Sequence, residues 1–167
     1  SAFFVPRSHY LLAKNINKIK DIDKKQIHVL FGDAGVFPHY VKAKCYDYNG
    51  LTDAYFATHK LTNAYFDKAN ADVVLIGFPS ADKEKLSYDW TNCKLIYNMV
   101  DKNSNFTYLG YTICKENGYY VHIYLRNNSV YHDDLNTALT TAIKESADAT
   151  FKIKRFLKFK YLYMDNI

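Results

Sequence analysis

Three acidic residues near glycine-containing turns could give this chain a polar ligand-binding site. Asp33 lies in a Gly-Asp-Ala-Gly turn that follows residues 27–31, an apolar and β-branched segment of strand length. Asp47 lies near the end of a second strand-like segment, residues 44–48, and Asp53 follows the Asn-Gly pair that breaks this segment. Ligands of open α/β sheets bind at the carboxyl ends of strands, so three carboxylates gathered there would form a polar rim for a hydroxyl-rich ligand or a cation.

Each of these carboxylates also has a purely structural interpretation. Asp and Asn near glycine commonly accept hydrogen bonds from nearby backbone N–H groups in turns and at helix N-termini. The functional interpretation therefore depends on the three carboxylates occurring together. His39 could act as an acid or base near Asp33, although most histidines make structural hydrogen bonds or face solvent.

The elements that would position these residues alternate between strands and helices in the first half of the chain. Residues 27–31, 44–48 and 73–78 are strand-like, and the last is a nearly continuous apolar run, typical of a strand covered on both faces in a parallel sheet. Short helices are predicted at 35–42 and 61–68. This order predicts an alternating α/β arrangement.

The second half of the chain predicts a different arrangement. Residues 107–114 and 119–125 are separated by Lys-Glu-Asn-Gly and predict an antiparallel hairpin. Residues 135–143 have helical spacing, and residues 151–163 alternate between apolar and basic side chains, which predicts a final strand. We therefore expect a single soluble α/β domain over residues 1–167, with a mixed sheet and flanking helices.

An amphipathic helix is predicted near the N-terminus. Ser8 is in a position to cap it, and Leu12, Ile16 and Ile19 follow at helical spacing. The ordinary interpretation is a surface helix packed on the sheet.

The composition is that of a globular domain with many aromatic residues. The hydrophobic fraction of 49% and the charged fraction of 23% are ordinary, and 167 residues suffice for one core. The 16 Tyr and 11 Phe suit strands, wet interfaces and sugar-stacking surfaces, although a low-GC codon bias would also produce them. The net charge of +5 is modest, so no nucleic-acid partner is expected.

No segment of the chain reads as a membrane span or a signal peptide. A span needs an apolar run of about 18 residues or more, and none occurs. This suits a soluble piece of a membrane protein and equally a cytosolic domain.

The cysteines do not predict a metal site. Cys45, Cys93 and Cys114 have no zinc-ligand spacing, and no metal or cofactor is expected. In an oxidising environment, Cys93 and Cys114 would be the pair to test for a disulfide. The ordinary alternative is that the cysteines are small buried hydrophobes.

The turn sequences resemble those of a known family. Gly-Asp-Ala-Gly-Val-Phe-Pro at 32–38, followed by Asp-Tyr-Asn-Gly-Leu-Thr-Asp-Ala-Tyr-Phe-Ala at 47–57, resembles the extracytoplasmic C-terminal region of polytopic membrane glycosyltransferases. These are the aminoarabinose, mannosyl and arabinofuranosyl transferases that use polyprenyl-phosphate sugars. The resemblance covers residues 26–77 and extends loosely to 126, and Ala54 and Ala71 depart from it where the family often has proline. The matching positions are Gly32, Gly35, Pro38, Tyr40, Asp47, Gly50, Leu51, Asp53 and Ala57.

The resemblance implies a domain of a longer membrane protein, on the extracytoplasmic (periplasmic or outer) face of a bacterial inner membrane. In that family the catalytic carboxylates belong to loops between transmembrane helices, so the domain would have no catalytic residue and would be inactive by itself. Its partners would be the transmembrane portion of the same polypeptide and a glycan or polyprenyl-phosphate sugar, which it would help to bind. The expected ligand-binding residues are Asp33, Gly35, Tyr40, Asp47, Asp53 and Arg126.

Arg126 ends the strand that resembles the closing strand of the family. Its guanidinium could pair with a carboxylate of the rim or bind a phosphate. A solvated surface arginine is the alternative.

Two other functions remain open. The order of strand, glycine turn and strand is compatible with a stand-alone small α/β enzyme acting on a nucleotide or nucleoside, although no nucleophile–base pair or phosphate loop has a recognisable spacing. The alternating lysines of residues 151–163 would suit a module that binds nucleic acid or an anionic membrane surface. They would equally protect an edge strand from pairing with another chain.

Overall fold

The computed structural model describes residues 7–33, 35–50, 61–89, 91–114 and 118–148. Asp53, the rest of the motif from Leu51 to Ala57, and the final strand expected at 151–163 lie outside the described residues.

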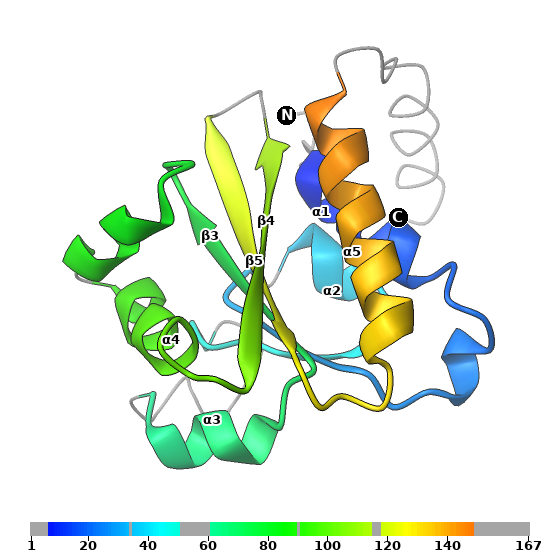
Figure 1. Cartoon of the computed structure of the whole chain (residues 1–167), viewed down its shortest axis with the longest axis horizontal. Helices are drawn as coiled ribbons and strands as arrows, with labels where there is room; N and C mark the ends of the chain where they lie inside the picture. Colours follow the sequence, from blue (N-terminus) through cyan, green and yellow to red (C-terminus); the bar gives the residue numbers. More distant parts are fainter. Residues whose placement is uncertain (1–6, 34, 51–60, 90, 115–117, 149–167) are drawn as a thin grey trace, which may run out of the picture.

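A mixed sheet of five strands forms the centre of the described part of the chain, in the order β2-β1-β3-β5-β4 (Figure 1). Its strands are β1 (His28–Phe31), β2 (Lys44–Tyr46), β3 (Val73–Phe78), β4 (Phe106–Cys114) and β5 (Tyr119–Arg126). Strand β1 pairs in parallel with β2 and β3, whereas β5 pairs antiparallel with β3 and β4. The predicted α/β class is confirmed, with a parallel first half and an antiparallel hairpin in the second.

Helices cover both faces of the sheet. One face carries α1 (Arg7–Ile16), α2 (Val36–Tyr40) and α5 (His132–Ala147). The other carries α3 (Asn63–Ala69), α4 (Asn92–Val100) and the 3₁₀ segment η2 (Lys83–Tyr88). A second 3₁₀ turn, η1 (Ile22–Lys24), precedes β1. The described chain is therefore a three-layer α/β/α arrangement.

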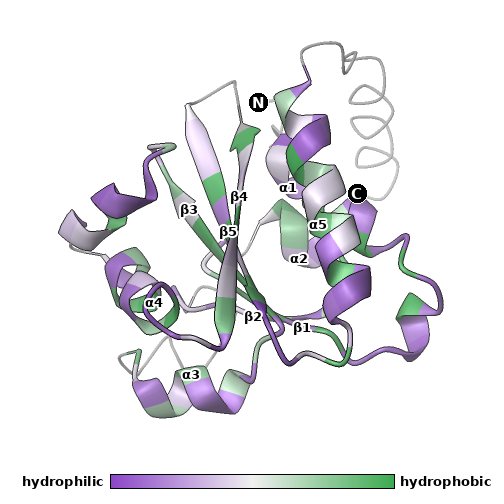
Figure 2. Cartoon of the chain, viewed as in Figure 1, coloured by the Kyte–Doolittle hydropathy of each residue, from purple (hydrophilic) through white to green (hydrophobic). Residues whose placement is uncertain are grey.

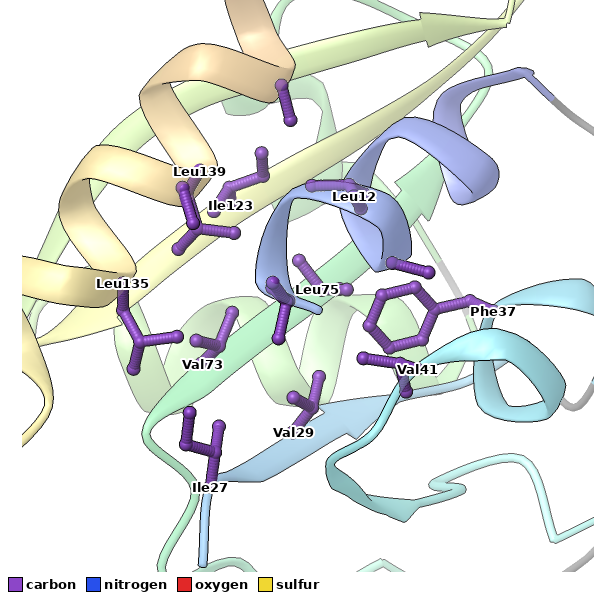
Figure 3. Packing of buried hydrophobic residues seen from close by; sticks show 14 of the residues in the cluster. Leu12, Ile27, Val29, Phe37, Val41, Val73, Leu75, Ile123, Leu135 and Leu139 are labelled. Atoms are coloured by element: carbon purple, nitrogen blue, oxygen red, sulfur yellow. The ribbon is translucent and has the colours of Figure 1, made fainter. Parts of the chain in front are cut away.

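Alternate residues of the central strands enter two separate hydrophobic clusters. Val73 and Leu75 pack with α1, α2 and α5, while Val74 and Ile76 pack with α3 and α4. All four are fully buried. Figure 3 shows the first cluster, in which Val73 and Leu75 lie among side chains from the helices above them. The period of two follows from the pleat of a strand, whose side chains point to opposite faces in turn.

The helices are amphipathic, as their positions require. Figure 2 shows hydrophobic and hydrophilic residues on different sides of α3, α4 and α5. Of the residues predicted at helical spacing in α5, Leu135, Ala138, Leu139 and Ala142 are buried, and Ile143 is partly buried. The prediction of this helix is confirmed, and the structure extends it to His132–Ala147. None of the helices in the described ranges is long and apolar enough to cross a bilayer.

Two local features differ from the sequence interpretation. Ser8 is the second residue of α1 and is fully buried, so the prediction that it caps the helix is wrong. Helix α4 was not predicted, because its apolar positions form only a short run. Its start is set by Thr91, whose side chain accepts a hydrogen bond from the Cys93 N–H, and Ile96, Tyr97 and Val100 are its buried residues.

Candidate functional site

The structure brings the turns of Asp33 and Asp47 to the same edge of the sheet. Because β1 and β2 are parallel and adjacent, both turns follow the carboxyl ends of their strands. Asn49, in the second turn, donates a hydrogen bond from Nδ2 to the carbonyl oxygen of Gly32, in the first, at 2.6 Å. The two turns are therefore joined directly.

Asp33 is the predicted site residue that is best placed to meet a ligand. Its side chain is 35% exposed. The Gly35 N–H donates to Oδ1 at 2.8 Å, and Oδ2 lies 3.5 Å from Nδ1 of His9 on α1. Gly35 contributes to the site through this backbone N–H. The carboxylate is thus oriented from both sides while part of its surface faces solvent.

Asp47 has a structural role, because its carboxylate accepts a backbone hydrogen bond within its own turn. It is only 4% exposed, and its Oδ1 accepts a hydrogen bond from the Asn49 N–H at 2.9 Å. Its carbonyl also accepts from the Gly50 N–H. Asp47 therefore shapes the turn that carries Asn49, and its burial leaves direct ligand contact to its neighbours.

Arg126 lies at the opposite end of the sheet, so the prediction that it joins the rim is wrong. Strand β5 runs antiparallel to β3, and the Arg126 N–H donates to the carbonyl oxygen of Asp72, just before β3 begins. Its Nε donates to the Ala71 carbonyl at 2.7 Å, and its guanidinium lies 4.8 Å from the centre of the Phe106 ring. These contacts give it a structural role in closing the sheet.

Tyr40 is also separated from the rim. It ends α2, and its carbonyl oxygen accepts a hydrogen bond from Nδ2 of Asn17, which follows α1. Asn17 also accepts from the Lys42 N–H, just before β2 begins. Tyr40 therefore lies toward the amino end of β2, away from Asp33.

The position between β1 and β3 is a topological switch point, because α2 and α3, on either side of β2 in the chain, lie on opposite faces of the sheet. Here two tyrosines fill the space where a crevice would be expected. A Cβ added to Gly32 would overlap the Tyr48 ring, and one added to Gly77 would overlap Oη of Tyr119. The glycines therefore leave room for the rings.

Tyr48 and Cys93 form a partly buried polar contact beside the end of β3, with 3.9 Å between Oη and Sγ. Tyr48 is 1% exposed, and its hydroxyl donates to the Leu75 carbonyl at 3.4 Å. Cys93 is a free thiol in the structure and forms no disulfide. Its Sγ donates a hydrogen bond to the Gly77 carbonyl oxygen at 3.5 Å. Burial raises the pKa of the Cys93 thiol, so the group stays protonated and is not an activated nucleophile.

His9 is the site residue that sequence reasoning missed. It is 1% exposed, and neither of its ring nitrogens makes a hydrogen bond to the described residues. Its ring packs edge-on against Phe31 and Tyr119 at 5.2 and 6.2 Å between centroids. Desolvation lowers its pKa, while the nearby charge of Asp33 acts in the opposite direction. One of six scattered histidines, it gave no signal in the sequence.

The described residues include no group of three or more His, Cys, Asp or Glu side chains that could hold a metal ion. No protein-family model, curated protein or solved structure matches the chain. Its function is therefore argued from the chemistry of this site and from the resemblance of its turn sequences.

The close packing of the Tyr48 ring on Gly32 predicts that an alanine at position 32 destabilises the fold. Gly32→Ala should lower the free energy of unfolding by about 1–3 kcal/mol, because the added methyl overlaps the buried ring of Tyr48. Urea denaturation measures the change. In a Tyr48→Leu background the same alanine should cost clearly less, and equal costs in both backgrounds would contradict the proposed overlap.

The burial of His9 predicts a pH-dependent contribution to stability. Its folded pKa should lie below the ordinary value of 6.5, so its contribution is present above that pH and is lost as the pH falls through the folded pKa. Asp33→Asn should lower the His9 pKa further, because it removes the charge that opposes desolvation. NMR titration of the imidazole resonances tests this, with the His9→Gln variant assigning the signal. A His9 pKa above 6.5, or one unchanged by Asp33→Asn, would contradict the assignment.

Proposed function

We propose that this chain is an extracytoplasmic domain of a polyprenyl-phosphate-dependent membrane glycosyltransferase. In this proposal it helps to bind a glycan acceptor or a lipid-linked sugar donor and has no catalytic activity alone. The observation that carries the proposal is the oriented, partly exposed carboxylate of Asp33 at the carboxyl end of β1. The turn sequences at 32–38 and 47–57, which resemble that family, support it.

The chemistry of the edge suits a ligand rich in hydroxyl groups. A carboxylate can accept several hydrogen bonds, and bonds to a charged acceptor contribute about 1.5–3 kcal/mol each. At Asp33 the Gly35 N–H occupies one position on Oδ1, which leaves further acceptor positions for sugar hydroxyls. Asn49, with its Nδ2 on Gly32, lies in the adjoining turn and extends the polar edge.

The same edge offers little for catalysis by the domain itself. The thiol of Cys93 is held protonated by burial, and the imidazole of His9 is sealed from solvent. A general base must reach the proton that it abstracts, directly or through one water. These features support a role in binding.

A nucleotide or nucleoside enzyme is the second candidate, favoured by one observation. The strand order β2-β1-β3 creates a switch point between β1 and β3, which is where open α/β sheets commonly bind nucleotides. The packing of Tyr48 and Tyr119 into that place argues against it.

Asp33→Asn should weaken sugar binding about tenfold or more, since it removes the charge from hydrogen bonds to the ligand. The asparagine keeps an oxygen that can accept from the Gly35 N–H, so the turn should survive. Two-dimensional NMR with soluble oligosaccharides and sugar phosphates measures the affinity. Asp21→Asn is a matched control, because it makes the same charge change at an exposed residue in a left-handed conformation that asparagine tolerates.

Two results of this experiment would redirect the assignment. Equal affinities for the wild type and Asp33→Asn would contradict a sugar site at this edge. Turnover of nucleotides by the wild type, abolished by Asp33→Asn, would favour the second candidate instead.

The proposed membrane context has a separate test. The coding sequence upstream of Ser1 should contain several hydrophobic segments of about 20 residues each, as a polytopic transferase requires. Sequencing of the complete gene decides this. A start codon immediately before Ser1 would contradict the membrane context. The sugar site would then depend on the binding experiment alone.

A further inference from the structure

A groove lies at the end of the sheet away from Asp33. It has a volume of about 340 Å³ and runs between the segment that follows α1 and the first half of α5. Helix α5 follows β5, whose last residue pairs beside Asp72 at the amino end of β3. The groove is therefore at the opposite end of the strands from Asp33. Its lining includes Lys18, Ile19, Lys20, Asp134, Thr137 and Ala138.

The groove carries positive charge that the described protein does not neutralise. Lys18 and Lys20 are exposed, and neither ammonium has a carboxylate partner within 4.0 Å among the described residues. The acidic residue of the lining, Asp134, has its Oδ2 3.2 Å from Nζ of Lys25, which offsets its charge. The neighbouring Lys14 is similarly engaged, with Glu145 at 3.0 Å.

A hydroxyl donor lies beside these ammonium groups. Thr137 is exposed, and its side-chain hydroxyl makes no hydrogen bond to the described residues. The Thr141 hydroxyl already donates to the Thr137 carbonyl at 2.7 Å, so its oxygen can only accept. Ile19 and Ala138, both buried, form an apolar floor.

We propose that this groove binds the phosphate group of a phosphomonoester. Two unpaired ammonium groups match the charge of a phosphate dianion, and lysine binds phosphate as a point charge without a fixed geometry. The Thr137 hydroxyl donates to a third phosphate oxygen. The volume is enough for the group together with part of a sugar or glycerol attached to it.

This proposal goes beyond the sugar site and is independent of it. The phosphate comes from either of two sources with the same chemistry, a soluble sugar phosphate or a lipid headgroup. Because both lysines are exposed, binding weakens strongly as ionic strength rises.

The experiment is a titration of the whole chain with inorganic phosphate at low ionic strength, in which two-dimensional NMR measures binding. The signals of Ile19, Thr137 and Ala138 should shift. In the double variant Lys18→Ala, Lys20→Ala the affinity should fall about tenfold or more, since both charged partners are removed.

A matched double variant, Lys85→Ala with Lys102→Ala, controls for net charge. It removes the same charge at exposed lysines on η2 and after α4, which belong to the opposite face of the sheet. Its phosphate affinity should stay within about twofold of the wild type. Thr137→Val should weaken binding severalfold, a change that general attraction by lysines would not produce.

Glucose 1-phosphate and vesicles containing phosphatidic acid, compared with neutral vesicles of phosphatidylcholine, separate the two sources. Binding to either phosphate source that is lost in the Lys18, Lys20 variant supports the site and identifies the source. The absence of any phosphate-induced shift, or equal losses in the two double variants, would overturn it. Asp33→Asn should leave phosphate binding unchanged, so failure of the sugar site and failure of this groove are distinguishable.

Discussion

The burial of β3 on both faces is the constraint on which the rest of the described structure depends. Its residues Val73 to Ile76 are fully buried, and their side chains alternate between the two hydrophobic clusters. Burial of each such side chain contributes about 1.5–3 kcal/mol relative to exposure. The strand also joins the two halves of the sheet, since it pairs in parallel with β1 and antiparallel with β5.

This position of β3 separates the polar groups into two sets. The parallel strands β1 and β2 deliver the turns of Asp33 and Asp47 to one edge, where the Asn49 side chain joins them. The antiparallel strand β5 runs the other way, so Arg126 and the start of α5 lie at the opposite edge. Strand direction thus decides which polar residues share a surface, whatever their distance in the sequence.

At the carboxyl ends of β1 and β3, packed aromatic rings and polar side chains lie next to each other. Tyr48 and Tyr119 fill the switch point against two glycines, and His9 is buried beside Tyr119. Burial of an imidazole without hydrogen bonds is unfavourable, and desolvation accordingly favours its neutral form. Asp33, at the margin of this packing, keeps part of its surface in solvent.

The sequence by itself determined the fold class, the strands at 73–78 and in the hairpin, and the helix that became α5. These depend on local patterns of period two or 3.6, which a single segment carries in full. It also placed Asp33 in a turn and Asp47 near the end of a strand, because glycine and asparagine act within a few residues. Only the tertiary structure decided that β5 runs against β3 and removes Arg126 from the rim, and that His9 on α1 lies beside Asp33. It likewise decided that Asp47 is buried. Those outcomes depend on contacts between residues far apart in the chain, and no local pattern encodes which distant side chains will meet.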